Sequence, residues 1–227
     1  MALADHIYSW DWANAELHYR RAIALNAHFA TAHHWYAIFL AELGRAEEAV
    51  AEIGHAQSLD PVSLIIGADA GMIFYLTRQY DHAVEQCRAT LDMDPNYFRA
   101  RMSLGCAFEQ KRQYREAIAE YETARTLDDS PYVLEWLARA YAMSGNIVEA
   151  NRLVEGLADP LSRVYVDSYY LASVYAALDR EDEAVRCLQR ACVERSCWLS
   201  RLRVDPIFDS LRLEAGFGPV LISLGLR

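Results

Sequence analysis

Residues 98–124 of the 227-residue chain read FRARMSLGCAFEQKRQYREAIAEYETA. Within them the small residue Gly105 stands three positions before the large Phe108, and Ala117 stands four positions before Tyr121. Small residues beside large ones let two helices pack closely, because a bulky side chain of one helix lies over the small residue of the other. The stretch therefore predicts a hairpin of two antiparallel helices.

The same arrangement recurs along almost the whole chain. Alanines stand in one column at intervals of 34, 34, 34, 33 and 34 residues: Ala15, Ala49, Ala83, Ala117, Ala150 and Ala184. Other columns keep this phase, since the residues four positions after these alanines are all apolar or aromatic. A period of this length indicates a repeat architecture in which each repeat is one supersecondary unit. The sequence thus predicts a stack of helical hairpins in place of one or two compact domains.

The second unit shows how a hairpin begins and ends. We expect its first helix over residues 30–43, a break at Gly44 and a second helix over residues 47–58. Asp60-Pro61 ends the unit, because proline cannot continue a helix and disfavours helix in the residue before it. Asp94-Pro95 repeats this stop one unit later.

Period and columns together resemble those of the tetratricopeptide repeat (TPR) family over residues 10–195. The best matches to its pattern are Leu104-Gly105, Phe108, Tyr114, Ala117, Tyr121 and Ala124 in one unit, and Leu137-Ala138, Tyr141, Gly145 and Ala150 in the next. The tryptophan that the family carries in its first helix is replaced by His33, Gly67, Arg101, Leu134 and Ser168. The resemblance implies an all-α fold, a right-handed α-solenoid of antiparallel helical hairpins, and a scaffold for protein–protein interaction.

Both ends of the chain depart from the repeat. Residues 1–9 provide only part of a first helix, so we expect a TPR array over residues 1–195, with a partial first repeat and units that start near residues 30, 64, 98, 131 and 165. Residues 196–227 are expected to form a helical cap over the apolar edge of the last hairpin, because exposed array ends favour aggregation. The phrase ERSCWLSRLRVDPIFDSLR (194–212) is also similar to the C-terminal TPR region of bacterial multidomain signalling proteins and winged-helix transcriptional regulators. That similarity implies a fragment of a larger protein.

Charge and composition narrow the possible partners and location. The chain has 32 acidic and 22 basic residues, and its net charge of −10 disfavours nucleic acid and anionic membrane surfaces. Five cysteines without metal-ligand spacing fit a reducing cytoplasm. No apolar run approaches the roughly 20 residues that span a bilayer, and the first residues lack the pattern of a signal peptide. We therefore expect a cytoplasmic location.

The first helices of such a stack line its concave face, where unit positions 2, 5, 9 and 12 share one side of each helix. From this stripe we predict the following peptide-binding residues: His34, Ile38, Met72, Tyr75, Arg99, Met102, Glu109, Tyr132, Glu135, Arg139 and Tyr169. The centre of this groove is apolar and aromatic and a few charges lie at its edge, which suits an amphipathic helix or an extended segment with bulky side chains. Lysine and asparagine recur here in TPR domains that grip a C-terminal carboxylate, but the stripe has neither, so that function is not expected.

The sequence contains no recognisable constellation for catalysis, a metal ion or a cofactor. The phosphate-binding patterns GxxxxGK[ST] and GxGxxG and the nucleophile pattern GxSxG are absent. His33 and His34 are adjacent, so their side chains point to different faces of a helix and do not form a metal site. We therefore expect a protein that is not an enzyme and has neither cofactor nor metal.

Two hypotheses about function remain. The first is a non-catalytic scaffold that binds a peptide or helix of a partner protein in its concave groove. The second is a self-association or regulatory arm of a larger bacterial transcription regulator or signalling enzyme. The unfinished first repeat motivates the second hypothesis, because it leaves apolar surface around Trp10, Trp12 and Tyr19 for a second copy to cover.

Overall fold

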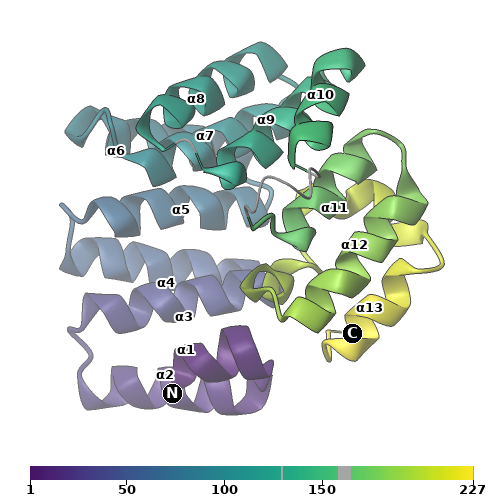
Figure 1. The fold of residues 1–227 in the computed structure, drawn as a ribbon. Helices are drawn as coiled ribbons and strands as arrows, with labels where there is room; N and C mark the ends of the chain where they lie inside the picture. The colour runs from purple at the N-terminus through teal and green to yellow at the C-terminus, as the bar shows by residue number, and fades with distance from the viewer. Residues whose placement is uncertain (129, 158–164, 227) are drawn as a thin grey trace.

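Helix pairs follow one another through the computed structural model of the protein, which describes residues 1–128, 130–157 and 165–226 (Figure 1). The pairs are α3 (Ala30–Glu42) with α4 (Ala46–Leu59), α5 (Leu64–Leu76) with α6 (Tyr80–Met93), α7 (Phe98–Gln110) with α8 (Tyr114–Leu127), α9 (Pro131–Met143) with α10 (Ile147–Leu157), and α11 (Ser168–Ala177) with α12 (Glu181–Glu194). The described residues contain no strand. The predicted all-helical stack of hairpins is confirmed, and each end of α3 and α4 lies within one residue of its predicted position.

One residue in the left-handed backbone region joins the first helix of each pair to the second. These residues are Gly44, Arg78, Arg112, Gly145 and Asp179, with φ values of 76°, 63°, 58°, 86° and 55°. Glycine adopts this conformation at no steric cost because it has no Cβ atom, whereas arginine and aspartate are strained there. The repeat period is therefore visible in the backbone as well as in the side chains.

The columns of small residues form the contacts between paired helices. Every alanine of the column that defines the repeat is completely buried. In α5, Gly71 faces the Cys87 thiol of α6, and in α7, Gly105 faces the Tyr121 ring of α8, so a Cβ atom at either glycine would collide with its neighbour. This is the packing of small against large residues that the sequence predicts.

The first unit is short. Helix α1 (Ala2–Ala4) runs into the π-helical turn η1 (Asp5–Ser9), and α2 (Trp12–Leu25) forms the second helix of the unit. Asp11 caps α2, because its carboxylate accepts a hydrogen bond from the Asn14 backbone N–H at 3.2 Å. The ring of His6 in η1 is buried, with Nδ1 at 3.2 Å from the Tyr19 hydroxyl and Nε2 at 2.6 Å from a Glu42 carboxylate oxygen.

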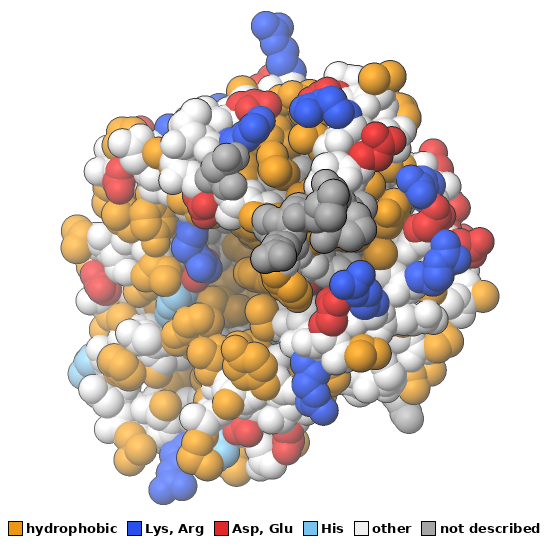
Figure 2. Space-filling view, viewed as in Figure 1, with side chains coloured by type: hydrophobic (Ala, Val, Ile, Leu, Met, Phe, Trp, Pro, Cys, Tyr) orange, Lys and Arg blue, Asp and Glu red, His pale blue; other side chains and the backbone are white. Residues whose placement is uncertain are grey.

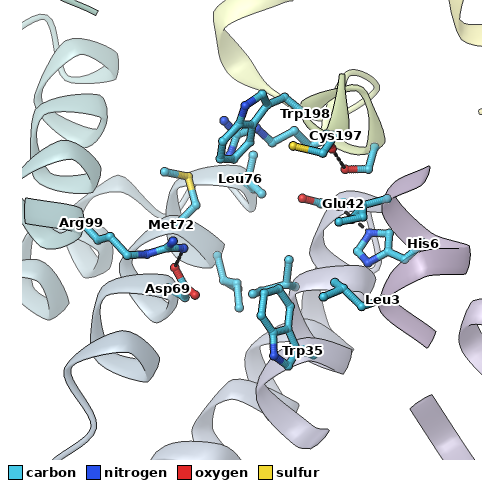
Figure 3. Close-up of a pocket in the computed structure, with 15 residues that line it drawn as sticks. Leu3, His6, Trp35, Glu42, Asp69, Met72, Leu76, Arg99, Cys197 and Trp198 are labelled. Atoms are coloured by element: carbon cyan, nitrogen blue, oxygen red, sulfur yellow. Dashed lines mark hydrogen bonds and ion pairs between the residues drawn. The ribbon is translucent and has the colours of Figure 1, made fainter. Parts of the chain in front are cut away.

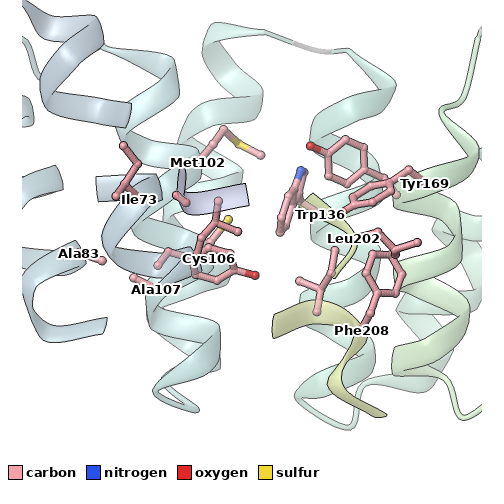
Figure 4. Packing of buried hydrophobic residues seen from close by; sticks show 14 of the residues in the cluster. Ile73, Ala83, Met102, Cys106, Ala107, Trp136, Tyr169, Leu202 and Phe208 are labelled. Carbon is pink, nitrogen blue, oxygen red and sulfur yellow. The ribbon is translucent and has the colours of Figure 1, made fainter. Parts of the chain in front are cut away.

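The C-terminal segment consists of the 3₁₀ helices η2 (Cys197–Arg201) and η3 (Pro206–Leu213) followed by α13 (Phe217–Ser223). Helix α13 packs against α12, where the sequence predicts a cap. Residues 197–213, which we call the C-terminal plug, instead enter the concave face, where Leu202 and Phe208 are completely buried (Figure 4). The sequence predicts only the cap. The plug forms because the concave stripe is apolar, and covering apolar surface contributes about 25 cal/mol per Å².

The superhelix curves far enough for its end to meet its beginning (Figure 1). The Trp12 indole Nε1 donates to the Leu224 carbonyl oxygen at 3.0 Å, and the Arg195 guanidinium donates to the Tyr8 carbonyl oxygen at 3.0 Å. The C-terminal segment thereby covers part of the edge of the first unit, where Trp10 and Trp12 are half-buried. Tyr19 is buried against His6, Tyr36 and Phe39. Among the described residues no helix has the length and apolar character to cross a membrane.

Candidate functional site

The carboxylate of Asp205 in the C-terminal plug holds the plug against the concave face. It accepts hydrogen bonds from the hydroxyl groups of Tyr75 at 2.9 Å and Tyr169 at 2.8 Å, and from the Ile207 backbone N–H at 3.2 Å. The Arg201 guanidinium pairs with it at 3.2 Å. Asp205 is completely buried, so these partners replace the water that its charge would otherwise require. Tyr75 and Tyr169, both predicted to bind a peptide, instead bind the plug.

Three further residues of the predicted stripe have ionisable side chains that are buried: Glu109, Glu135 and Arg139. Glu109 of α7 and Arg139 of α9 form an ion pair, and the Arg139 guanidinium also lies over the Trp136 ring at 4.9 Å from its centroid. Burial and the nearby Asp167 carboxylate raise the pKa of Glu135 to about 9, so this side chain is neutral at pH 7. None of the three is exposed to a partner, because each is at most 2% accessible.

A pocket remains open at the centre of the concave face, between the plug and the first helices of the N-terminal half (Figure 3). Figure 2 shows the same hollow surrounded by hydrophobic side chains. The part nearer the N-terminus, which we call the apolar chamber, has a volume of about 190 Å³. Most of the apolar side chains that line it come from the first unit and from α3 and α5, and Trp198 comes from the plug: Leu3, Ile7, Trp35, Ile38, Met72, Ile73, Leu76 and Trp198.

A second part of the pocket, which we call the polar chamber, has a volume of about 220 Å³. Its lining includes Phe98, Met102 and Ser103 of α7 and Tyr132 of α9. The two chambers share the following lining residues: Asp69, Met72, Arg99, Trp198 and Arg201. Of the predicted stripe, the pocket therefore brings together Ile38, Met72, Arg99, Met102 and Tyr132.

Ionisable side chains lie in pairs on opposite sides of the pocket (Figure 3). On one side the Asp69 carboxylate receives a hydrogen bond from the Arg99 guanidinium at 2.6 Å, and its other oxygen lies 2.8 Å from Nε2 of His34. Burial raises the pKa of Asp69, but His34 and Arg99 lower it by more, so it lies below its usual value and the carboxylate is charged. On the other side are His6 and Glu42.

Four residues of the pocket wall come from outside the repeat, and the sequence-based prediction missed all of them: Cys197, Trp198, Ser200 and Arg201. The Trp198 ring stacks on Tyr132, with centroids 6.2 Å apart and planes at 20°. The Arg201 guanidinium lies over Trp198 at 4.7 Å from its centroid and donates to the Tyr170 hydroxyl at 2.6 Å. The available signal was the spacing of Arg201 and Asp205 by four residues, which favours an ion pair on a helix.

This arrangement is suited to binding. Apolar and aromatic walls with a few polar groups are typical of ligand pockets, and the concave form excludes water from whatever enters. Within the described ranges, no group of three or more His, Cys, Asp or Glu side chains is placed to hold a metal ion. His33, which is adjacent to His34, points away from the pocket to Glu52, with 2.6 Å between Nδ1 and the carboxylate.

Comparison with known proteins shows which folds this chain resembles. The family model described as tetratricopeptide repeat matches residues 69–131 and 102–158, and the comparison with curated proteins gives no match. A solved tetratricopeptide repeat protein from Parabacteroides merdae is 14% identical with a TM-score of 0.68, covering 96% of this chain and 78% of its own. PilF of Pseudomonas aeruginosa is 17% identical with a TM-score of 0.57, covering 79% of this chain and 82% of its own. A double mutant of MamA RS-1 is 18% identical with a TM-score of 0.52, covering 65% and 88%. At these identities the likeness concerns the fold.

Proposed function

We propose that this chain, which matches the tetratricopeptide repeat family model over residues 69–158, is a non-catalytic scaffold for protein–protein interaction whose partner places a bulky apolar side chain in the apolar chamber. The observation that carries the proposal is the apolar chamber, a hollow that stays open beside the plug. Open apolar hollows of this kind are typical of binding sites on proteins.

The size of the chamber limits what can enter. A helix is about 10 Å across with its side chains and would need a continuous groove. The sequence predicts room for a helix along the concave face. The plug occupies that groove between Tyr75 and Tyr169, so we propose a smaller ligand. One bulky side chain from a short or extended partner segment fits a hollow of about 190 Å³. The proposed ligand is accordingly a short segment with a single anchoring residue, which is how interface hot spots are commonly built.

Burial of the first unit supports a scaffold over self-association. Part of the surface that would pair two copies is covered within one chain, because Trp12 donates to the Leu224 carbonyl oxygen and Tyr19 is buried against His6 and Phe39. A clean monomer in light scattering at high protein concentration is the expected result. A stable dimer that is lost on Trp12→Ala would favour the self-association hypothesis instead.

Selection of binding peptides tests the proposal. Peptides are selected from a random display library on the wild-type chain and then measured against Met72→Trp, which fills the pocket because Met72 lines both chambers. We expect the selected peptides to share one bulky apolar residue and to bind Met72→Trp at least about tenfold more weakly, a loss of about 1.4 kcal/mol.

Met93→Trp is the matched control, because Met93 is exposed near the end of α6 and does not line the pocket. It should bind the selected peptides as the wild-type chain does, and circular dichroism should show the same helical content for both variants. Peptides that bind both variants equally would place the binding surface elsewhere on the molecule.

A further inference from the structure

The geometry points to the polar chamber as a site for a carboxylate attached to a small apolar body. This inference deepens the proposed function, on which it rests for the position of the ligand, because it names the chemistry of the group that the pocket receives. The inference rests on polar side chains that line the chamber. Each of them has at least one N–H or O–H group with no hydrogen-bond partner among the described residues.

Arg201 is the first of these groups. The side chain is 4% accessible, and its Nη2 donates to Tyr170 while Nε faces Asp205. Its Nη1 makes no hydrogen bond to any residue that the structure describes, and the side chain lines both chambers. Nη1 is therefore a donor that an incoming acceptor can take up.

Arg99 and Ser103 supply further donors from α7. They are four residues apart and therefore lie on one face of the helix. One Arg99 nitrogen is bound to Asp69, and its Nε and Nη1 have no hydrogen-bond partner among the residues described. Ser103 is 4% accessible and lines the chamber, and its hydroxyl likewise has no hydrogen-bond partner in the described part of the chain. The three side chains present guanidinium and hydroxyl donors to one small volume.

The acidic groups near the chamber do not satisfy these donors. Asp69 already receives Arg99 and faces His34, and Asp205 accepts from two tyrosine hydroxyl groups and a backbone N–H. A planar carboxylate matches the fork of a guanidinium and can accept two hydrogen bonds from it. An incoming carboxylate would therefore accept hydrogen bonds from the unused donors of the chamber.

The remaining walls determine what the carboxylate is attached to. They are aromatic or thioether side chains: Met72, Phe98, Met102, Tyr132 and Trp198. A strongly hydrated body would lose its water against these walls without replacement, whereas an aryl or branched alkyl group gains from the contact. The ligand class is thus a small apolar monocarboxylate, which can come as a free acid or as the acidic side chain of a partner segment next to its apolar anchor.

Titration calorimetry with phenylacetate and 4-methylpentanoate tests the free acid, and the corresponding amides are the matched neutral ligands. We expect each carboxylate to bind at least about tenfold more tightly than its amide. Arg99→Met and Ser103→Ala should each weaken the carboxylate and leave the amide unchanged, whereas Arg112→Met, at an exposed turn, should change neither. These variants leave Arg201 in place, because its loss would disturb the plug. Equal binding of acid and amide would overturn the inference.

A second set of measurements separates the two sources of the carboxylate. Short peptides with an Asp or Glu beside a bulky apolar residue are compared with their Asn or Gln counterparts. Binding of acidic peptides without binding of free acids assigns the carboxylate to the partner segment, and binding of free acids assigns it to a small molecule. If neither binds while peptides selected on the apolar chamber still do, the carboxylate inference is wrong and the proposed function stands. If acids bind and no selected peptide does, the proposed function is wrong and the site remains.

Discussion

Buried polar side chains decide how the C-terminal plug sits on the repeats. Asp205 connects Tyr75 of α5 with Tyr169 of α11, residues that lie 94 positions apart in the sequence, through one carboxylate. The same carboxylate compensates the buried charge of Arg201. A carboxylate with this many partners fixes one position of the plug, because a shift in any direction would leave at least one buried group unpaired.

We predict that Asp205→Asn lowers the free energy of unfolding by about 3 kcal/mol or more, because it leaves the Arg201 charge buried without its partner. Asp209→Asn is the matched control. Asp209 pairs with Arg78 and Arg212 near the surface, and such exposed pairs contribute less than about 1 kcal/mol. Urea unfolding followed by tryptophan fluorescence measures both changes. Similar losses for the two variants would contradict the role given to Asp205.

Residues outside the repeat columns were the part of the site that the sequence did not predict. Met72, Arg99 and Met102 could be predicted because helical periodicity places them on the concave face whatever lies opposite. Trp198 and Arg201 could not, because a non-repeating segment carries no phase that relates it to a particular helix. The contact of Tyr75 with Asp205 of the plug could not be predicted either, since periodicity gives the direction of a side chain and not what it meets.

At the scale of elements, the left-handed residue between paired helices shows how the repeat tolerates sequence variation. Glycine occupies this position at Gly44 and Gly145, whereas Arg78, Arg112 and Asp179 adopt the same backbone conformation with a Cβ atom. A non-glycine residue in this region is strained by roughly 1 kcal/mol. Helix packing on either side supplies the free energy that holds the turn in place, which is why the hairpins could be predicted from their alanine columns even where the turn residue is unusual.

Arg112→Gly should therefore stabilise the protein by about 1 kcal/mol, because the exposed Arg112 adopts a φ of 58°. Arg78→Gly should stabilise it by less, since that change also removes the ion pair between Arg78 and Asp209. Thermal unfolding of the two variants beside the wild-type chain gives the comparison. A lower melting temperature for Arg112→Gly would show that the turn is not strained.

At the scale of the molecule, the plug changes how the repeats depend on one another. In an open array each hairpin contacts only its neighbours, and unfolding can proceed from repeat to repeat. Here the plug contacts α5 through Tyr75 and α11 through Tyr169, and Leu224, directly after α13, contacts the first unit through Trp12. Distant repeats therefore share one buried surface, and the chain should unfold as a single cooperative unit.

A chain that ends at Glu194 tests this cooperativity, because it lacks the plug and α13 but keeps the hairpins. We expect the intact protein to show one transition in urea, with the same midpoint by circular dichroism and by fluorescence. The shortened chain should unfold over a broader range with different midpoints for the two signals, and it should bind a hydrophobic dye through the uncovered concave face. An equally sharp transition in both chains would mean that neighbouring hairpins alone provide the cooperativity.

The plug also imposes an order of events during protein synthesis. The ribosome adds Asp205 to the chain 130 residues after Tyr75, whose hydroxyl donates a hydrogen bond to the Asp205 carboxylate. At ribosomal speeds of about 5–20 residues per second, that interval lasts roughly 7 to 26 s. Throughout it, the hairpins that emerge first have a concave face with neither its apolar cover nor its buried acceptor. The nascent chain is thus most exposed to aggregation or to chaperone binding just before its plug is made.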